Sequence, residues 1–227
     1  MTNLDPAKFD VAVIGGGIIG SAVAYFLLRE APTLSVCVIE PDPTYEFASA
    51  LRASGGCRVQ FTCPENIEMS KYSIDFIKHF ERTMATKTRA APVDWVEGGY
   101  LFIVPPEAAV NLERNARIQT DHGCVAHLMT PSELKARFPS MNVDDLGAGV
   151  HTPHDGWCDP NGLLWGFRRK AVELGASFIH DKFTTAEVDA VKAKSVILES
   201  GRRVVADSFV NATGAWSGAV ARQFGMH

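Results

Sequence analysis

The first forty residues show an apolar pattern that changes its period twice. β-Branched residues dominate the apolar run from Phe9 to Ile14, which predicts a buried strand that glycines end. From Gly17 to Glu30 the apolar positions follow a helical period, and charge appears only at the end of the segment. Pro32 forbids continuation of this helix, and the apolar run Leu34–Ile39 predicts a second strand. A unit of this length needs a crossover between parallel strands, so the pattern predicts the opening of a Rossmann-like α/β sheet.

The rest of the chain mixes helical and strand patterns. Residues 41–64 are rich in Pro, Ser, Ala, Gly and Arg, which predicts a long loop with at most a short turn of helix. Pro64 suits the first turn of a helix with one apolar stripe, and Thr130 and Glu133 have the spacing of a capping box ahead of a short helix. The other expected elements are a strand at Tyr100–Val104, a helix at Glu107–His122, a helix at Asp159–Leu174, a strand at Ala176–His180, a hairpin of Ser195–Glu199 and Arg202–Val205, a strand at Ser208–Asn211 and a last helix that ends at Gly225.

Charge and composition narrow the class of partner. The chain has 227 residues, a formal net charge of -4 and a pI near 6.0. It therefore lacks the basic field that nucleic acid or an anionic lipid surface needs, and a small-molecule partner is expected. The five cysteines include no CxxC pair, which favours a reducing compartment, the cytoplasm or the mitochondrial matrix. The uncharged run Val11–Leu28 is long enough to span a membrane, but its glycines favour a buried strand and helix, so no membrane span is expected.

The turn after the first strand has the sequence of a dinucleotide fingerprint. Gly15, Gly17 and Gly20 match G-x-G-x-x-G between a strand and a helix, and Glu40 ends the next strand. Gly15 permits a tight turn, Gly17 lets a pyrophosphate approach the backbone, and Gly20 lets the helix pack closely. The N-terminus of the helix favours the phosphates, and Glu40 can accept hydrogen bonds from ribose hydroxyls. FAD and NAD share this adenosine diphosphate, so the fingerprint leaves the choice between them open.

Further segments resemble those of known flavoproteins. Residues 49–56 read SALRASGG, Cys57–Phe61 follows them, and Val210–Ser217 reads VNATGAWS. Together with Phe9–Glu40, these segments resemble the D-amino-acid and sarcosine oxidase-like family of FAD-dependent oxidoreductases. The continuation Pro64–Ile67 is similar to a subgroup with sarcosine and dimethylglycine dehydrogenase-like proteins and a mitochondrial complex I assembly factor. The resemblance implies FAD as the cofactor.

The resemblance also implies a set of cofactor contacts. Residues 49–56 would pass beneath the pyrophosphate and beside the isoalloxazine, and Val210–Ser217 would lie near the phosphates and ribose. Val188 would lie against the adenine, with a core valine in an amphipathic strand as the alternative. Arg58 would offer charge to the flavin or to a substrate carboxylate, with a solvated loop arginine as the alternative. The expected cofactor-binding residues are Gly15, Gly17, Ile18, Gly20, Glu40, Ser49, Arg52, Ser54, Gly55, Gly56, Arg58, Val188, Ala212, Gly214 and Trp216.

The same resemblance implies a domain division. Residues 1–90 would form the first part of an FAD-binding domain, residues 91–154 part of a mixed α+β substrate domain, and residues 155–227 the second part of the FAD-binding domain. Relatives continue for a comparable length after Ser217. We therefore expect a truncated form, whose missing half belongs to a longer chain or to a partner subunit.

The implied activity is oxidation of a carbon-nitrogen bond in a small amine or amino acid of the sarcosine, dimethylglycine or D-amino-acid type. Two other interpretations stay open: a non-catalytic FAD-binding or assembly protein, and an NAD-dependent dehydrogenase. No catalytic residue is assigned. His151, His154 and Cys158 have spacings that metal ligands can show, but they lack a fourth ligand and a plain turn fits them better, so no metal is expected.

Overall fold

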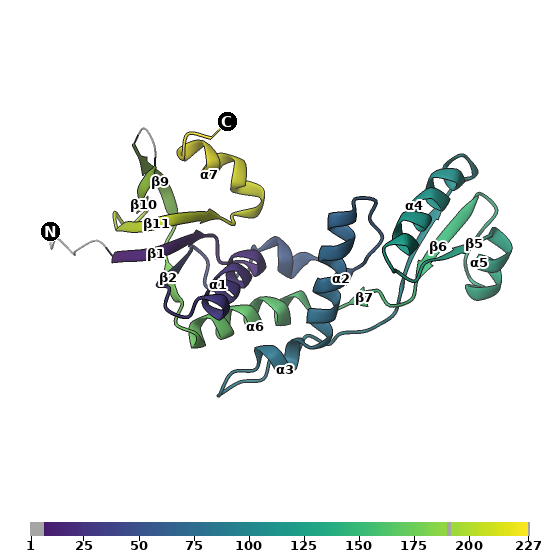
Figure 1. The fold of residues 1–227 in the computed structure, drawn as a ribbon, viewed down its shortest axis with the longest axis horizontal. Helices are drawn as coiled ribbons and strands as arrows, with labels where there is room; N and C mark the ends of the chain where they lie inside the picture. The colour runs from purple at the N-terminus through teal and green to yellow at the C-terminus, as the bar shows by residue number, and fades with distance from the viewer. Residues whose placement is uncertain (1–6, 190–191, 227) are drawn as a thin grey trace. The chain divides into compact units, whose positions relative to one another are not determined.

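The computed structural model describes residues 7–189 and 192–226 (Figure 1). The chain divides into two compact units. Unit 1 consists of residues 1–53, 82–92 and 160–227, and unit 2 consists of residues 54–81 and 93–159. The division differs from the expected one mainly at residues 54–81, which belong to unit 2 rather than to the first cofactor segment.

Unit 1 is built on a six-stranded sheet. In sheet order the strands are β8 (Ser177–His180), β2 (Val36–Glu40), β1 (Ala7–Ile14), β11 (Arg203–Asn211), β10 (Ala193–Leu198) and β9 (Phe183–Val188). The first four strands in this order are parallel, and β10 is antiparallel to both of its neighbours. The predicted parallel pairing of the first two strands is confirmed, with a register that runs from Val11 opposite Val36 to Ile14 opposite Ile39.

The hairpin region differs from the sequence-based expectation. The segments Arg202–Val205 and Ser208–Asn211, expected as two strands, form the single strand β11. Ala206 joins them because it is buried in the core and pairs with Phe9 of β1, which keeps the backbone extended between the two apolar runs. Strand β9 corresponds to the amphipathic strand that was the alternative setting for Val188, but most of its side chains are exposed and Val188 itself is 44% exposed.

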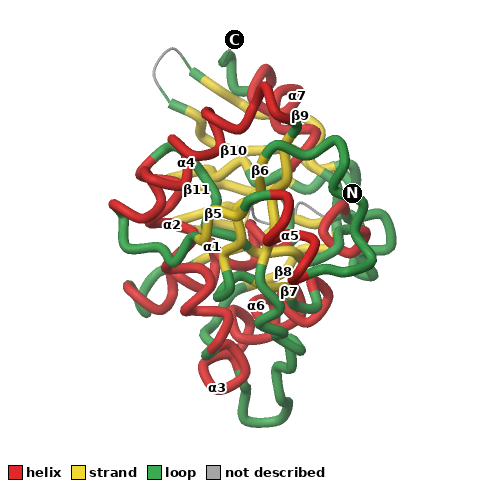
Figure 2. Tube along the Cα trace, turned by 90° about the vertical axis from the view of Figure 1, so that its right-hand side faces the viewer, coloured by secondary structure: helices red, strands yellow, loops and turns green. Residues whose placement is uncertain are grey.

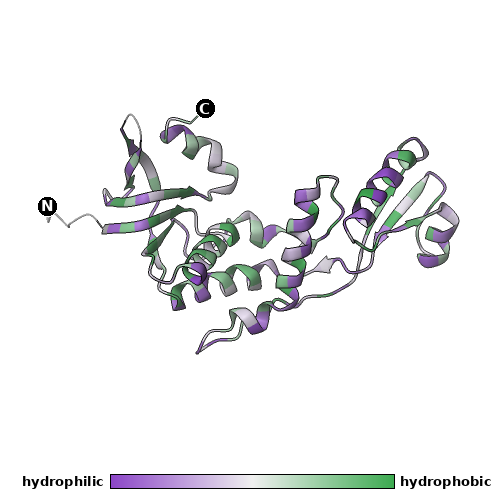
Figure 3. Ribbon diagram, in the orientation of Figure 1, coloured by the Kyte–Doolittle hydropathy of each residue, from purple (hydrophilic) through white to green (hydrophobic). Residues whose placement is uncertain are grey.

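Helices cover the sheet of unit 1. Helices α1 (Ile18–Glu30) and α6 (Pro160–Glu173) lie side by side (Figure 1), and Tyr25 of α1 contacts Phe167 of α6 with ring centroids 5.7 Å apart. Helix α7 (Ser217–Gln223) packs on β9 and β11. Apolar residues dominate α1 and the neighbouring strands (Figure 3), which explains why an uncharged run of this length forms a core. None of the helices in the described part of the chain is long and apolar enough to cross a bilayer.

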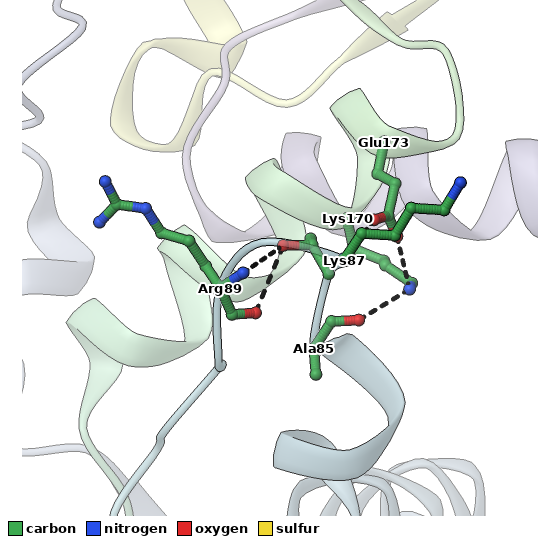
Figure 4. Close-up of polar contacts among 6 residues, drawn as sticks. Ala85, Lys87, Arg89, Lys170 and Glu173 are labelled. Carbon is green, nitrogen blue, oxygen red and sulfur yellow. Dashed lines mark hydrogen bonds and ion pairs between the residues drawn. The ribbon is translucent and has the colours of Figure 1, made fainter.

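Residues 82–92 are fastened to α6 within unit 1 (Figure 4). Lys170 donates from Nζ to the carbonyl of Ala85 at 2.9 Å and forms an ion pair with Glu173 at 2.7 Å. Glu173 also accepts a hydrogen bond from the backbone N–H of Lys87 at 2.7 Å. The hydrogen bond from Lys170 and the one from Lys87 hold the pKa of Glu173 below its usual range. One carboxylate thus joins two segments that are far apart in the sequence.

Unit 2 carries a three-stranded antiparallel sheet and a two-stranded ladder. Its strands and main helices are β3 (Gly56–Cys57), α2 (Pro64–Lys78), β4 (Tyr100–Val104), α4 (Ala109–Asp121), β5 (His127–Met129), α5 (Pro131–Arg137), β6 (Ala148–Thr152) and β7 (Gly156–Trp157). Helices α4 and α5 pack against the three-stranded sheet, whose strands are yellow in Figure 2. The remaining short elements of the two units are α3 (Phe80–Met84) and the 3-10 turns η1 (Ser49–Arg52), η2 (Pro106–Ala108) and η3 (Gly214–Trp216).

Two helix predictions in unit 2 can be compared with the structure. The capping box is confirmed: Thr130 accepts from the N–H of Glu133, and the Glu133 carboxylate accepts from the N–H of Thr130 at 2.7 Å. The predicted apolar stripe of α2 buries Ile67 and Ile74, whereas Met69 of the same helix is 60% exposed. Met69 lies two positions after Ile67, which places it on a different face of the helix.

We expect Gly20→Ala to destabilise the fold by about 2–4 kcal/mol. The added Cβ would meet a backbone atom, which cannot move aside as the end of a flexible side chain can. A Cβ on Gly20 would lie 1.8 Å from the carbonyl oxygen of Gly15. Urea unfolding followed by circular dichroism measures the change. Gly218→Ala is the control, because a Cβ there meets only the end of the Arg222 side chain at 3.8 Å. Equal midpoints for wild type and Gly20→Ala would contradict the close packing of this turn.

The Glu173 contacts predict a specific pH dependence. The folded pKa of Glu173 lies below its usual value of 4.5, so its contribution to stability is present above about pH 4.5 and is lost as the pH falls through the folded pKa. Glu173→Gln should lower the unfolding midpoint at pH 7, and the difference from wild type should shrink below about pH 4.5. Glu199→Gln removes an exposed ion pair with Lys182 and serves as the control with little effect. A difference that is independent of pH would argue against the role of the carboxylate charge.

Candidate cofactor site

The carboxyl ends of three parallel strands meet at one edge of the unit 1 sheet. Ile14, the last residue of β1, lies opposite both Ile39 of β2 and Asn211 of β11. The N–H of Gly15 donates to the carbonyl of Ile39 at 2.9 Å, and the N–H of Ala212 donates to the carbonyl of Ile14 at 2.8 Å. The structure therefore brings together the fingerprint, the end of β2 and the second predicted contact segment. Ligands of open parallel sheets bind at this kind of edge.

Two fingerprint glycines are required by close backbone contacts. Gly15 has a φ of 98°, and a Cβ there would lie 2.5 Å from the carbonyl oxygen of Ala212. Gly20 is buried beneath the turn, where a Cβ would meet the Gly15 carbonyl. These positions join α1 to β1 and to the segment after β11, as the fingerprint predicts.

Gly17 is required by neither a strained φ nor a contact within the protein. It is the N-cap of α1 with a φ of -61°, and a Cβ there would meet nothing within 4 Å. No side chain caps the helix at this end, so the first-turn N–H groups next to Ile18 stay available to an external acceptor. Open space in front of an uncapped helix N-terminus fits a phosphate group, which supports the predicted role of Gly17 and Ile18.

Glu40 is held at the tip of β2 by two backbone donors. Its Oε2 accepts from the N–H of Gly16 at 2.7 Å, and its Oε1 accepts from the N–H of Asp42 at 2.9 Å. Each carboxylate oxygen has a second lone pair, so this geometry orients Glu40 and leaves it capacity for ribose hydroxyls. The bond to Gly16 links the residue expected to bind the ribose directly to the turn expected to bind the phosphates.

Asn211 is a site residue that the sequence analysis did not single out. Its Oδ1 accepts from the Thr213 hydroxyl at 2.7 Å, and its Nδ2 donates to the carbonyl of Ser217 at 2.8 Å. These bonds hold the turn that contains Ala212 and Gly214, and Gly214 needs its left-handed φ of 57°. The Asn-x-Thr spacing at the end of an apolar strand is the signal that predicts such a side-chain-stabilised turn.

The other predicted contacts in unit 1 lie on exposed elements. Ser49 and Arg52 belong to the 3-10 turn η1, and the Arg52 guanidinium carbon lies 5.4 Å from the centroid of the Phe47 ring. Trp216 is in η3 and is 64% exposed. Exposed aromatic rings such as that of Trp216 are surface that a planar ligand can cover.

Val188, predicted to lie against the adenine, is the last residue of strand β9. Strand β8 ends at His180, which lies opposite Glu40, and the N–H of Asp181 donates to the carbonyl of Glu40 at 3.2 Å. Strand β9 begins at Phe183 and is extended, so Val188 lies roughly 16 Å further along the strand, at its far end. The residues that reach the Glu40 edge are therefore 181–183.

Unit 2 contains the remaining predicted contacts. Ser54 is exposed, Gly55 has a φ of 73°, and Gly56 pairs with Trp157 in the β3–β7 ladder. Around this ladder, a cavity of about 360 Å³ is lined by Ser54, Gly56, Gly99, Tyr100, Gly156 and Trp157. The glycine-containing loop thus borders an open space within its own unit.

Arg58 of unit 2 lies among three aromatic rings. Its guanidinium carbon is 5.1 Å from the ring centroid of Phe61, 5.4 Å from that of Tyr100 and 5.2 Å from that of Phe102. Its buried Nε has no hydrogen-bond partner among the described residues. This arrangement orients the guanidinium by cation–π contacts and leaves donors for an anion.

Asp155 is a buried carboxyl that sequence reasoning did not single out. It is 1% exposed and accepts from the N–H of Val59 at 3.1 Å and from the hydroxyl of Thr152. Burial raises the pKa of Asp155, while these hydrogen bonds and the charge of Arg58 oppose the rise. By accepting from Val59, Asp155 fixes the backbone next to Arg58.

The three residues with metal-ligand spacing, His151, His154 and Cys158, lie in different surroundings, and Cys158 is buried. His151 is buried in β6, and His154 forms a hydrogen bond with Glu97 at 2.7 Å. Within residues 7–189 and 192–226, no group of at least three His, Cys, Asp or Glu side chains has the arrangement of a metal site.

Comparison with known proteins decides the family. The sequence model of the FAD-dependent oxidoreductase family, DAO, matches residues 10–227. The chain belongs to this family. It is 34% identical over 248 residues to a protein from Xenopus laevis called FAD-dependent oxidoreductase domain-containing protein 1, with 99% of this chain and 50% of the relative covered. It is also 26% identical to human mitochondrial sarcosine dehydrogenase, over 97% of this chain and 24% of the relative.

Solved structures of FAD-dependent oxidoreductases share the fold. The L-proline dehydrogenase from P. horikoshii has a TM-score of 0.83 and 28% identity, and the match covers 96% of this chain and 56% of that one. Glycine oxidase from Geobacillus kaustophilus matches with a TM-score of 0.80 at 20% identity, which supports the fold alone. The chain spans about half the length of the FAD-dependent oxidoreductase domain-containing relative from Xenopus laevis.

Gly17→Val should separate cofactor binding from folding. A branched Cβ would fill the open space before α1, so we expect FAD affinity to fall by roughly tenfold to a hundredfold. The free energy of unfolding should change by about 1 kcal/mol or less, the scale of an N-cap substitution. Fluorescence titration with FAD and urea unfolding measure the two quantities. Unchanged FAD affinity in a folded Gly17→Val variant would refute the assignment of the phosphate site.

Proposed function

We propose that this chain binds FAD, that unit 1 holds the adenosine diphosphate part, and that the FAD serves oxidation of a carbon-nitrogen bond in a small amine or amino acid. The observation that carries the proposal is the junction at the sheet edge. There Gly15 contacts Ala212, the N–H of Gly16 binds Glu40 at 2.7 Å, and the N-terminus of α1 is uncapped. These features provide an anion site and a ribose acceptor on adjacent residues.

Different residues of unit 1 would bind the diphosphate and the ribose of FAD. The first-turn N–H groups of α1 and its dipole would hold the diphosphate, since Gly17 leaves the approach open. Glu40 would accept from the ribose hydroxyls, and its carboxylate disfavours a 2′-phosphate by charge repulsion. FAD supplies the hydride acceptor, and the protein orients and stabilises it.

Support for an amine or amino-acid substrate comes from relatives and from Arg58. The names of sarcosine dehydrogenase, dimethylglycine dehydrogenase and L-proline dehydrogenase all describe oxidation of small amino acids. Arg58 offers an oriented cation with unused donors, which suits a substrate carboxylate or the negative charge of a reduced flavin. Because the chain spans about half of its Xenopus laevis relative, this activity is proposed for the complete catalytic assembly, in which a longer chain or a partner subunit contributes the rest.

A non-catalytic FAD-binding or assembly protein is the second candidate. The Xenopus laevis relative, at 34% identity, carries a name that states a domain and no substrate, so its likeness supports FAD binding without specifying a reaction. The NAD-dependent alternative has no comparable support, because the family is FAD-dependent.

Visible absorption spectroscopy tests the proposal. The purified chain should develop the absorption bands of protein-bound oxidised flavin when FAD is added, and NAD in excess should not displace it. In the complete catalytic assembly, anaerobic addition of sarcosine, dimethylglycine or a D-amino acid should bleach these bands. Betaine is the matched control, because its quaternary nitrogen has no lone pair to drive loss of hydride.

The outcomes separate the candidates. Bleaching by one amine supports an amine oxidoreductase and identifies its substrate class. Bound flavin that no amine bleaches in the complete assembly supports the non-catalytic candidate. Failure to bind FAD under any of these conditions would overturn the cofactor assignment.

A further inference from the structure

A strained and buried tyrosine lies behind the predicted ribose site. Tyr45 is 1% exposed and has a left-handed backbone with a φ of 59°, which is costly for a residue with a bulky side chain. A Cβ placed on Gly16 would lie 3.2 Å from the Tyr45 hydroxyl and 2.8 Å from the Cβ of Glu40. The hydroxyl is therefore beneath the Gly16–Glu40 hydrogen bond, and not at the surface.

Polar atoms around this tyrosine are buried and under-used. The Tyr45 hydroxyl, the Nε of Arg168 and the Oδ2 of Asp42 have no hydrogen bond of good geometry with any described residue. Arg168 still lies close enough to the Tyr45 hydroxyl to lower its pKa, so the two groups interact without a well-aligned hydrogen bond. Backbone strain and incompletely paired polar groups in one place point to a role in function.

Arg168 is held over the tyrosine by aromatic rings. Its guanidinium carbon is 5.6 Å from the ring centroid of Tyr45, 5.0 Å from that of Trp165 and 4.9 Å from that of Phe178. Burial raises the pKa of Tyr45 to about 12, with the charge of Arg168 opposing the rise, so the hydroxyl stays protonated at neutral pH. The cluster therefore offers a proton donor and a fixed positive charge to the acidic groups near it, Glu40 and Asp42.

We propose that Tyr45 and Arg168 are positioning residues that hold Gly16 and Glu40 in the geometry that selects a nucleotide with free ribose hydroxyls. Tyr45 fixes the Gly16–Glu40 corner from below, and Arg168 offsets the repulsion between the Glu40 carboxylate and the diphosphate that binds one turn away. The inference rests on the proposed nucleotide site and adds the source of its ribose specificity.

The test is calorimetric titration of the chain with ADP and with 2′-deoxy-ADP. Wild type should prefer ADP, and Tyr45→Phe should bind ADP about threefold to tenfold more weakly and lose most of this preference. Its unfolding midpoint should stay equal or rise, because the substitution removes a buried hydroxyl that lacks a good partner. Tyr25→Phe is the matched control, a tyrosine of the same unit that is 3% exposed and packs against Phe167.

Substitutions of Arg168 and Glu40 provide further tests of the positioning role. Arg168→Met keeps a long side chain among the aromatic rings and should weaken both nucleotides, while Arg168→Lys should restore part of the affinity. Glu40→Gln should abolish the preference for ADP, and Tyr45→Phe should then have no further effect on it, because the two residues act through one contact.

The results distinguish the two proposals. If wild type binds neither ADP nor FAD, the nucleotide site itself is wrong. If wild type binds and prefers ADP but folded Tyr45→Phe and Arg168→Met keep the same affinity and preference, the positioning role is overturned. Additive effects of Tyr45→Phe and Glu40→Gln on the preference would overturn it as well.

Discussion

The site depends on the contact of backbone with backbone at the first turn. The carbonyl of Gly15 lies where a Cβ of Gly20 would be, and a Cβ on Gly15 would meet the carbonyl of Ala212. Because neither neighbour is a flexible side chain, both positions require glycine. This close packing places the N-terminus of α1 at the carboxyl ends of β1, β2 and β11, and every predicted role in binding the diphosphate follows from it.

Side-chain hydrogen bonds orient the residues at this edge of the sheet. Glu40 is oriented by the N–H groups of Gly16 and Asp42, and Asn211 holds the turn that contacts Gly15. Tyr45 lies beneath Gly16 with a strained backbone and an incompletely paired hydroxyl. The surrounding fold maintains the strained backbone and the buried hydroxyl of Tyr45, as expected of a preorganised binding site.

In unit 2, contacts with aromatic rings orient the side chain of Arg58. Aromatic rings surround the Arg58 guanidinium, and buried Asp155 fixes the backbone beside it through the N–H of Val59. The charge of Arg58 in turn opposes the effect of burial on the pKa of Asp155. A cation with unused donors and a cavity bordered by Tyr100 in the same unit are features that an anionic group can use.

The features that depend on local order could be predicted from the amino-acid sequence. The change of period from strand to helix, the glycine spacing and the acidic residue at the end of β2 predicted the parallel strands and the position of Gly15, Gly17, Gly20 and Glu40, because these signals lie within one supersecondary unit. The capping box of Thr130 and Glu133 was predictable for the same reason.

The features that depend on pairing between distant segments became visible in the folded chain. The tertiary structure placed Val188 at the end of strand β9, it joined two expected strands into β11, and it assigned residues 54–81 to unit 2. It also brought Tyr45 and Arg168 together, although 123 positions separate them in the chain. Such contacts are set by packing and by strand register across the whole sheet, which no local period in the sequence encodes.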